Sequence, residues 1–234
     1  MSRVAIISDI HSNLEALEAV LRAADADGIR EIHCLGDIVG YGTNPAECVD
    51  IVSMYCAAVV RGNHDEAVAT GRGIDYLPTW GAEAARHNRE MLSEDHLDYL
   101  AGLPLRLEVD GMTLVHATPD RPEAWRRLHS FKDVRAQFAA FETDICFVGH
   151  THIPGTVGER LGSTRVRPGS RFIVNVGSVG QPRDNDRRAC LGIFDLESFT
   201  YELRRIPYNY DAAARKVEAA GLTSRLDERL GWGS

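Results

Sequence analysis

The sequence predicts an α/β fold built around a parallel sheet, and three observations support this. Over the first 60 residues, apolar runs of strand length alternate with helical segments. Most of these runs end in polar residues, and a hairpin and an antiparallel pair follow later in the chain. Strand–helix alternation is typical of parallel strands joined by right-handed crossovers. With 234 residues, 44% of them hydrophobic, the chain can bury one sizeable core. We therefore expect a single domain over residues 1–234.

Composition and charge narrow the class of protein. The formal net charge of -8 argues against a protein that grips nucleic-acid backbones, because that function needs a basic face. No signal peptide or membrane span is recognisable, and the five cysteines form no Cys-x-x-Cys pair. We therefore expect a cytoplasmic protein with reduced, buried cysteines, no membrane association and no strong nucleic-acid binding.

The first strand and helix already combine structure with chemistry. An apolar run from Val4 to Ile7 predicts a buried strand, and it is followed directly by Asp9 and His11. Asn13 then opens an amphipathic helix, where it can act as the N-cap or contact a phosphate group. Open α/β sheets place their ligand sites at such strand ends.

The next two strands repeat this arrangement. They are predicted over residues 31–35 and 57–60, with a helix over 45–55 between them. The earlier strand ends at Asp37, and the later one runs into the polar stretch Arg61, Gly62, Asn63, His64 and Asp65. Two roles stay open for Asp65, which can orient His64 or cap the helix that follows.

Residues 66–102 have a helical and polar pattern, with one helix over 79–92 and another that begins after Ser93. Trp80, Ala84, His87 and Met91 recur at helical spacing and predict the inward face of the longer helix. The segment lies between residues with site chemistry, so we expect a small helical cap that selects the substrate. The alternative is that these helices only cover a sheet edge.

The second half of the chain adds more strand ends with polar residues. A hairpin with its turn at Asp110-Gly111 leads to His116, and a later apolar strand leads to His150 and His152. The elements predicted here are strands over 105–109, 112–115, 145–148, 172–176, 190–196 and 199–206, and helices over 133–141 and 211–220.

The polar strand ends form one set of residues with the chemistry of metal ligands: Asp9, His11, Asp37, Asn63, His64, His116, His150 and His152. Carboxylate, imidazole and amide donors together suit a first-row ion such as Mn, Fe, Co or Zn. The set has too many nitrogen donors for Ca, and no thiolate cluster indicates structural Zn. Even if one of these eight residues is not a ligand, seven ligands are too many for one open catalytic ion. They suit a pair of ions about 3.5–4 Å apart, as used for in-line attack at phosphorus.

These motifs, taken in order, resemble those of the calcineurin-like metallophosphoesterases. The resemblance rests on Asp9-x-His11, Gly36-Asp37, Gly62-Asn63-His64-Asp65, His116 and Gly149-His150-x-His152. Residues 175–184 resemble a loop of the small prokaryotic members, which include diadenosine-tetraphosphatase-like and phosphodiesterase-like enzymes. The family resemblance implies a four-layer α/β/β/α sandwich of two mixed sheets flanked by helices.

The resemblance also implies roles for these residues. One divalent ion would be held by Asp9, His11 and His152 and the other by Asn63, His116 and His150, with Asp37 shared. Manganese is expected first, with Fe, Zn, Co and Ni as alternatives. A hydroxide that bridges the two ions would be the nucleophile. His64 would donate a proton to the leaving oxygen or clamp the phosphate.

The substrate-binding residues are less defined by these motifs. Asn13, Arg61 and Arg183 are the candidates for contacts with phosphate oxygens. The Gly-Asp-x-x-Asp-Arg-Gly motif of protein Ser/Thr phosphatases is absent after Gly36, so the residue that supports His64 is undetermined. Four histidines and three aromatic residues are expected to be structural, solvated or packing residues: His33, His87, His96, His129, Tyr76, Trp80 and Trp125.

The sequence thus predicts a dinuclear metal-dependent phosphoesterase. Its substrate would be a small phosphate ester or nucleotide, and a dinucleoside polyphosphate is one candidate. The first alternative is a nuclease acting on short nucleic acid, which would need a basic groove lined by aromatic residues. The second is a non-catalytic metal-binding scaffold, which the presence of His64 disfavours. The oligomeric state is left open.

Overall fold

Two five-stranded sheets form the centre of the fold, which we describe from a computed structural model covering residues 2–160, 162–222 and 233. The first sheet has the order β10 (Thr200–Ile206), β9 (Ala189–Asp195), β1 (Arg3–Ile7), β2 (Glu31–Cys34) and β3 (Ala58–Val59). The second has the order β4 (Arg106–Val109), β5 (Met112–Val115), β6 (Ile145–Val148), β8 (Phe172–Asn175) and β7 (Gly155–Gly158).

Both sheets are mixed, and each has a parallel set of three strands. In the first sheet β1, β2 and β3 are parallel, while β9 and β10 form an antiparallel pair beside β1. In the second, β5, β6 and β8 are parallel, and the edge strands β4 and β7 are antiparallel to their neighbours. The carboxyl ends of parallel strands share one edge of a sheet, where ligand sites form.

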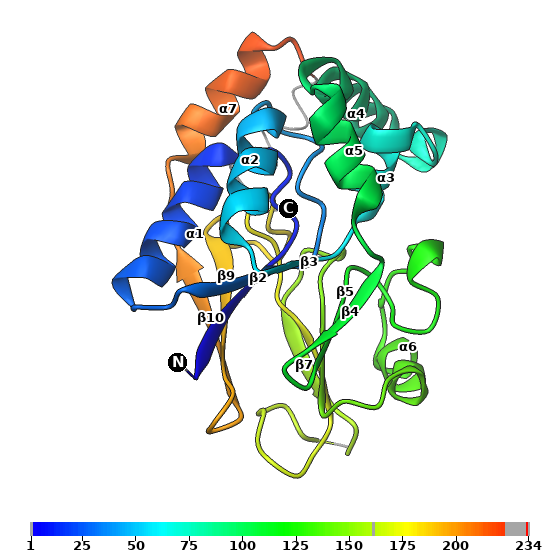
Figure 1. Cartoon of the computed structure of the whole chain (residues 1–234), viewed down its shortest axis with the longest axis vertical. Coiled ribbons are helices and arrows are strands. Elements are labelled where there is room, and N and C mark those ends of the chain that lie inside the picture. The colour runs from blue at the N-terminus through cyan, green and yellow to red at the C-terminus, as the bar shows by residue number, and fades with distance from the viewer. Residues whose placement is uncertain (1, 161, 223–232, 234) are drawn as a thin grey trace.

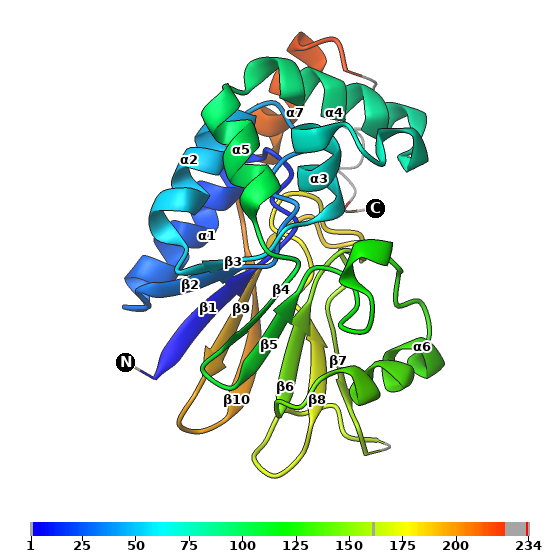
Figure 2. The ribbon, with the colours of Figure 1, turned by 45° about the vertical axis from the view of Figure 1, so that its right-hand side comes forward.

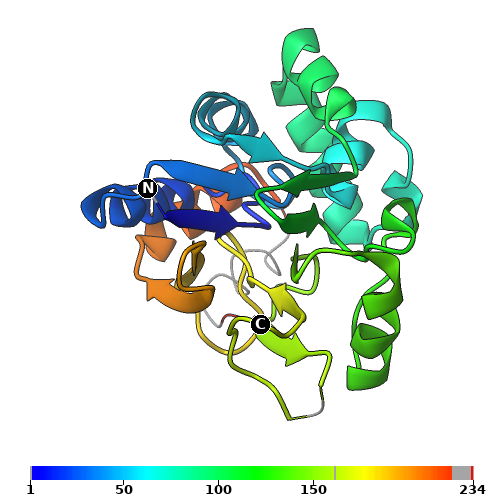
Figure 3. The ribbon, with the colours of Figure 1, turned by 60° about the horizontal axis from the view of Figure 1, so that its bottom comes forward.

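Helices cover the outer faces of both sheets (Figures 1 and 2). On the side of the first sheet lie α1 (Leu14–Ala26), α2 (Pro45–Tyr55), α3 (Asn63–Thr70), α4 (Thr79–Met91), α5 (Glu94–Gly102) and α7 (Tyr210–Ala219). On the side of the second sheet lies α6 (Phe131–Ala136), which continues as the 3-10 helix η3 (Gln137–Ala140). Two further 3-10 turns, η1 (Ile74–Tyr76) and η2 (Pro122–Ala124), lie in loops. The predicted four-layer sandwich is therefore confirmed (Figure 3).

Three apolar layers hold this sandwich together. Between the sheets, Ile6 and Leu35 pack with Phe147, whose ring centroid lies 5.5 Å from that of Phe194. The opposite face of the first sheet packs against the helices through residues such as Leu17. The outer face of the second sheet is covered from α6 and η3. Alternating strand residues thus serve two different cores, as the period of two in a β-strand requires.

Local sequence signals explain many of the element boundaries. The turn between β4 and β5 has positive φ at Asp110 (47°) and Gly111 (75°), the geometry of a type I′ hairpin. Asn13 and Ser93 cap α1 and α5 by accepting bonds from backbone N–H groups. Gly221, just after α7, has a φ of 69°. These boundaries agree with the prediction.

Some sequence-based expectations of secondary structure were wrong. Strand β7 was not predicted, because Gly155–Gly158 is a short edge strand without an apolar run. The helix predicted over 133–141 begins at Phe131 and becomes a 3-10 helix at Gln137. The inward face of α4 also differs from the predicted stripe, since Met91 is 45% exposed. The buried residues of α4 are Gly81, Ala82, Ala84, Ala85 and Asn88.

Residues 66–102 belong partly to the core. Ala85, Leu97 and Leu100 pack into the apolar layer between the first sheet and its helices. The short stretch 72–78, between α3 and α4, has no fully buried residue; only Ile74 and Leu77, both partly buried, pack against this layer. All five cysteines are free thiols, and four of them are buried, as expected. Within the described ranges, no helix is both long and apolar enough to cross a membrane.

Candidate metal centre

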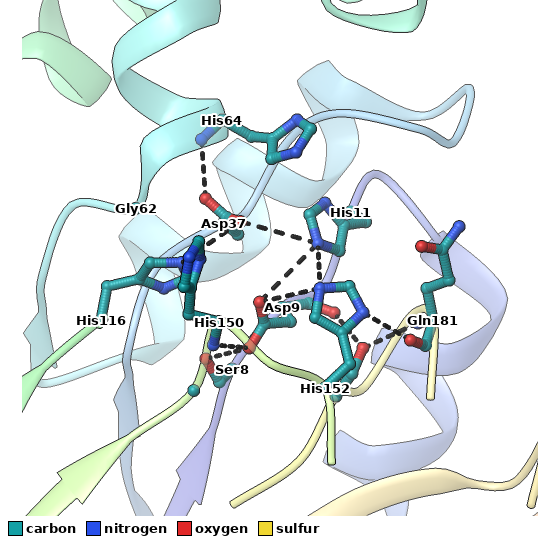
Figure 4. A network of polar contacts seen from close by, with 12 residues as sticks. Ser8, Asp9, His11, Asp37, Gly62, His64, His116, His150, His152 and Gln181 are labelled. Carbon is teal, nitrogen blue, oxygen red and sulfur yellow. Dashed lines mark hydrogen bonds and ion pairs between the residues drawn. The ribbon is translucent and has the colours of Figure 1, made fainter. Parts of the chain in front are cut away.

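Six side chains from both sheets gather at the carboxyl ends of the parallel strands (Figure 4), and a seventh candidate, Asn63, follows the third strand of the first sheet. Asp9, His11, Asp37 and Asn63 follow the three parallel strands of the first sheet. His116, His150 and His152 follow β5 and β6 of the second sheet. The cluster therefore lies where the two sheets meet, and each sheet supplies only part of it.

The first group consists of Asp9, His11 and His152. The Nε2 atoms of the two histidines lie only 3.0 Å apart, and that of His152 is 3.2 Å from Asp9 Oδ1. His11 Nδ1 faces the carbonyl of Val39 at 3.1 Å, and His152 Nδ1 faces that of Gln181 at 2.5 Å. Carbonyls only accept, so each Nδ1 carries the proton and each Nε2 presents a lone pair. Two lone pairs this close favour a cation between them.

The second group shares Asp37 with the first. His116 Nδ1 donates to the carbonyl of Leu35 at 2.9 Å, and its Nε2 lies 3.2 Å from His150 Nδ1 and 3.3 Å from Asp37 Oδ2. The same Asp37 oxygen lies 3.7 Å from His11 Nε2. Asn63 Oδ1 is buried and has no hydrogen-bond partner among the described residues. Asp37 is therefore placed to bridge the two groups.

The backbone around this cluster is held in an unusual conformation. Five of its residues have left-handed φ values: Asp9 (54°), His11 (52°), Asp37 (51°), His150 (65°) and His152 (62°). For residues with a Cβ this region costs roughly 1–2 kcal/mol each. Such strain persists only where the surrounding structure fixes the backbone, and it clusters at functional sites.

Two glycines allow the loops to approach each other closely. A Cβ on Gly62 would collide with the carboxylate of Asp37, and one on Gly149 would collide with Ser8 and Asp9. The Ser8 hydroxyl donates to Asp9 Oδ2 at 2.7 Å. The glycines of the Gly62-Asn63 and Gly149-His150 motifs are therefore required for packing around the carboxylates.

The electrostatics of the cluster suit cation binding. Burial opposes ionisation of Asp9 and Asp37, but neighbouring histidines outweigh it and hold the pKa of each carboxyl well below its usual range. Burial lowers the pKa of His150 to about 3 and that of His152 to about 4. Burial also opposes the charge on His116, but Asp37 raises its pKa to about 9. Metal ions require carboxylates and neutral imidazoles, so these two aspartates and His150 and His152 are already in the required state, whereas His116 would release a proton on binding a metal.

Asp65 organises the loop of Asp37. Its carboxylate accepts bonds from the backbone N–H groups of Asp37 (2.8 Å), Ile38 (2.8 Å), Val39 (3.2 Å) and Gly62 (2.9 Å). Gly62 is the N-cap of α3, so Asp65 caps its own helix. Of the two roles left open by the sequence, the structure shows capping and no hydrogen bond to the His64 ring.

His64 lies above the two groups. Its backbone N–H donates to Asp37 Oδ1 at 2.8 Å, and its ring packs between Tyr41 (4.4 Å between centroids) and His11 (4.9 Å). Its Nδ1 is buried and makes no hydrogen bond with any described residue. Burial lowers the pKa of His64 well below its ordinary value. One ring nitrogen of His64 also lies within 4.8 Å of donor atoms of His11 and Asp37, close enough for the three residues to share a metal ion.

A cleft of about 740 Å³ opens over the cluster. Asp37, Asn63, His64, His150 and His152 form part of its lining. Residues 72–78 and 123–127 contribute much of the rest, and three arginines border it: Arg72, Arg127 and Arg183. Arg183 donates to Gln181 Oε1 at 2.7 Å and lies over the Tyr41 ring. The cleft lining thus combines candidate metal ligands with these three arginines and with two acidic residues, Glu66 and Glu123.

Comparison with known proteins identifies the family. The family model of the calcineurin-like phosphoesterase superfamily domain matches residues 2–198. The chain belongs to this superfamily. It is 40% identical to the uncharacterized protein MJ0912 of Methanocaldococcus jannaschii, over 98% of this chain and 97% of that protein.

Solved structures of similar proteins agree with this placement. The crystal structure of a metallophosphoesterase from Sphaerobacter thermophilus is 36% identical, with a TM-score of 0.88 over 99% of each chain. The hypothetical protein PH1004 from Pyrococcus horikoshii OT3 is 21% identical, with a TM-score of 0.84 over 100% of this chain and 99% of that one. The second comparison shows the fold alone.

The donor set of this phosphoesterase fits two divalent ions. Two buried oxygens have no hydrogen-bond partner among the described residues: Asp9 Oδ1, in the first group, and Asn63 Oδ1, whose residue lines the cleft. An unpaired buried polar atom is costly, so these oxygens fit ligands of a cation better than members of a complete hydrogen-bond network. The clusters of the structure thus match the two-metal character of the family.

Two predicted substrate contacts are not supported by the geometry. Asn13 accepts from Ala16 N at 3.1 Å and donates to Gly180 O at 2.9 Å, so both ends of its amide are used. Arg61 donates to Ala101 O at 2.6 Å and pairs with Glu66 at 3.3 Å. Neither residue lines the cleft of the phosphoesterase, in contrast to Arg183.

Sequence reasoning missed several residues that position the site. Asn88 of α4 is buried; its Oδ1 accepts from Ser12 Oγ and Gly40 N (both 2.7 Å), and its Nδ2 donates to Gly42 O at 2.8 Å. Asn175 donates to Gly149 O at 2.7 Å. The signal for Asn88 was present in the sequence, since it is an amide on the small-residue face of a helix. The sequence marked Asn175 only as the first residue of the loop over 175–184, without a role for its side chain.

Proposed function

We propose that this phosphoesterase hydrolyses small phosphate esters or nucleotides with two divalent ions, manganese first. The observation that carries the proposal is the pair of Nε2 atoms of His11 and His152, which lie 3.0 Å apart beside Asp9. The second group shares Asp37 with it. Asp9, His11 and His152 would hold one ion, and Asn63, His116 and His150 the other. Asp37 would bridge them.

The chemistry divides between the ions and the chain. Two divalent ions, when bound, polarise the phosphoryl group and supply hydroxide at neutral pH. His64 sits at the cleft, where its imidazole donates a proton to the leaving oxygen. Its lowered pKa means that the metal-free, substrate-free site holds it neutral. An anionic phosphoryl group in the cleft favours the protonated ring, which couples proton uptake to substrate binding.

The walls of the cleft would select the substrate. The arginines Arg72, Arg127 and Arg183 border the cleft, and guanidinium groups bind phosphate oxygens in a bidentate manner. On this basis we propose that residues 66–102 form a cap that selects the substrate. The stretch 72–78 is the part that lines the cleft along with Glu66, and Tyr76 in it is 94% exposed. This stretch would contact the part of the substrate that does not react.

The test combines metal analysis with hydrolysis of p-nitrophenyl phosphate and its bis ester. After reconstitution with manganese we expect two ions per chain and metal-dependent hydrolysis. Asp37→Asn removes the shared charge, so it should lower metal content and cut kcat/KM more than about 100-fold. Asp25→Asn, at a 64% exposed side chain on α1, is the matched control and should match the wild type. One ion or fewer per wild-type chain would refute the dinuclear proposal.

A further inference from the structure

A second group of metal-ligand residues lies away from the cleft. It consists of Glu31 and His33 on β2 and Asp110 in the turn before β5, and one donor atom from each lies within 4.8 Å of the others. The catalytic cluster follows the carboxyl ends of β2 and β5, whereas Glu31 begins β2 and Asp110 precedes β5. This group is therefore at the opposite end of the sandwich.

His33 is the unusual member of the group. Its side chain is 1% exposed, and neither ring nitrogen makes a hydrogen bond with any residue that the structure describes. Ile6, its partner across the strand pair, faces the core between the sheets, and so does Leu35 two residues later. An imidazole buried in this way loses its bonds to water, which is unfavourable if nothing replaces them.

Ordinary ion pairing does not satisfy this ring. Burial lowers the pKa of His33 although Glu31 and Asp110 oppose this shift, so the ring is neutral at neutral pH. His33 Nε2 lies 3.5 Å from Glu31 Oε1, too far for a hydrogen bond. Donor atoms bound at about 2.1 Å to one tetrahedral ion lie roughly 3.4 Å from each other. The observed separation therefore suits two ligands of a common ion.

We propose that His33, Glu31 and Asp110 bind a third divalent cation, of which zinc suits one imidazole and two carboxylates best. The two carboxylates balance the charge of the ion. Because Glu31 and His33 belong to the first sheet and Asp110 to the turn that joins β4 and β5 in the second, the ion links the sheets. Its role is structural, since the group contacts no residue of the catalytic cluster and lies outside the cleft.

The test compares zinc content and thermal stability of the full chain after dialysis against Zn²⁺. Asp110→Asn keeps the left-handed turn, because asparagine tolerates positive φ, and removes one carboxylate. Glu31→Gln removes the other at a side chain that is 41% exposed. Both variants should bind one ion fewer than the wild type, and the rise in Tm on adding Zn²⁺ should shrink. Hydrolysis of p-nitrophenyl phosphate should stay unchanged.

The control is His96→Gln, which removes a histidine that lies 3.0 Å from the carboxylate of Asp50 on the surface. It should retain the full zinc content and the full shift in Tm. Equal zinc content in the wild type and both carboxylate variants would overturn the proposal, and so would the same loss in His96→Gln. The difference of one ion is independent of how many ions the catalytic cluster binds.

Discussion

At the scale of single residues, the site depends on which atom of each side chain is free. Backbone carbonyls of Val39 and Gln181 fix the protons of His11 and His152 on Nδ1 and leave both Nε2 atoms for metal. The sequence motifs identified the histidines but not their partners. Val39 and Gln181 are 28 and 29 positions away from the histidines that they contact, so only the folded chain brings them close. The sequence could thus name the candidate ligands, but not the tautomers of the histidines among them.

The role of His64 can be separated from metal binding. We expect His64→Asn to lower kcat by about 10²–10⁴ for substrates with poor leaving groups, since these need a proton. The loss should be smaller for p-nitrophenyl phosphate, and metal content should not change. His129→Asn, at an exposed histidine, is the control. The measurements are kcat for a series of substrates with different leaving groups and the metal content of each variant. An equal loss on every leaving group, or a loss of metal, would contradict the assignment.

At the scale of elements, residues 66–102 contribute both to the core and to the lining of the cleft. Helices α4 and α5 pack into the core, and Asn88 of α4 holds the loops that follow β1 and β2. Only 72–78 is left to face the cleft with Glu66. Helical periodicity predicted that these helices exist. The face that packs inward was missed because α4 packs through glycine and alanine, whose side chains give a weak pattern.

Changes in the stretch 72–78 should therefore alter substrate preference more than chemistry. We expect Arg72→Ala and Tyr76→Ala to lower kcat/KM for nucleotides roughly tenfold, the effect of losing about 1.4 kcal/mol of substrate contacts. Hydrolysis of p-nitrophenyl phosphate by these variants should stay near the wild-type rate. The control variant, Arg22→Ala on α1, should hydrolyse both substrates at the wild-type rate. Steady-state kinetics on both substrates provide the measurement. A parallel fall of both activities would show that the stretch is scaffold.

At the scale of the whole molecule, local patterns predicted strands and helices but not how two sheets face each other. Periodicity identifies an apolar run such as β6, yet nothing in that run says which sheet it joins or that β1 and β9 pair antiparallel. The sandwich followed from the ordered motifs, because a family resemblance includes the tertiary arrangement. Neither the local patterns nor the family resemblance predicted edge strand β7.

The cluster also predicts how stability of the metal-free protein depends on pH. His150 and His152 have folded pKa values of about 3 and about 4, below the unfolded value near 6.5. The unfolded chain therefore takes up their protons first, and stability falls as the pH drops below about 6.5. His116, raised to about 9, has the opposite effect, and its stabilisation is lost as the pH rises from 6.5 to 9.

We therefore expect the metal-free protein to be most stable near pH 6.5, with the steeper decline on the acid side. Urea unfolding in the presence of a chelator, repeated between pH 4 and pH 9, measures this curve. His116→Asn should flatten the alkaline side. Stability that rises steadily from pH 6.5 to pH 9 would show that His116 is not paired with Asp37 in the metal-free state.

The division of the metal ligands between the two sheets has a consequence for folding. Asp9 and His152 are 143 positions apart in the chain, and the cluster exists only after the sheets have docked. Contacts of such long range are formed late, because loop closure must precede them. Interactions absent from the folding transition state act on the unfolding rate alone. Metal binding here should thus slow the opening of the finished sandwich without speeding its assembly.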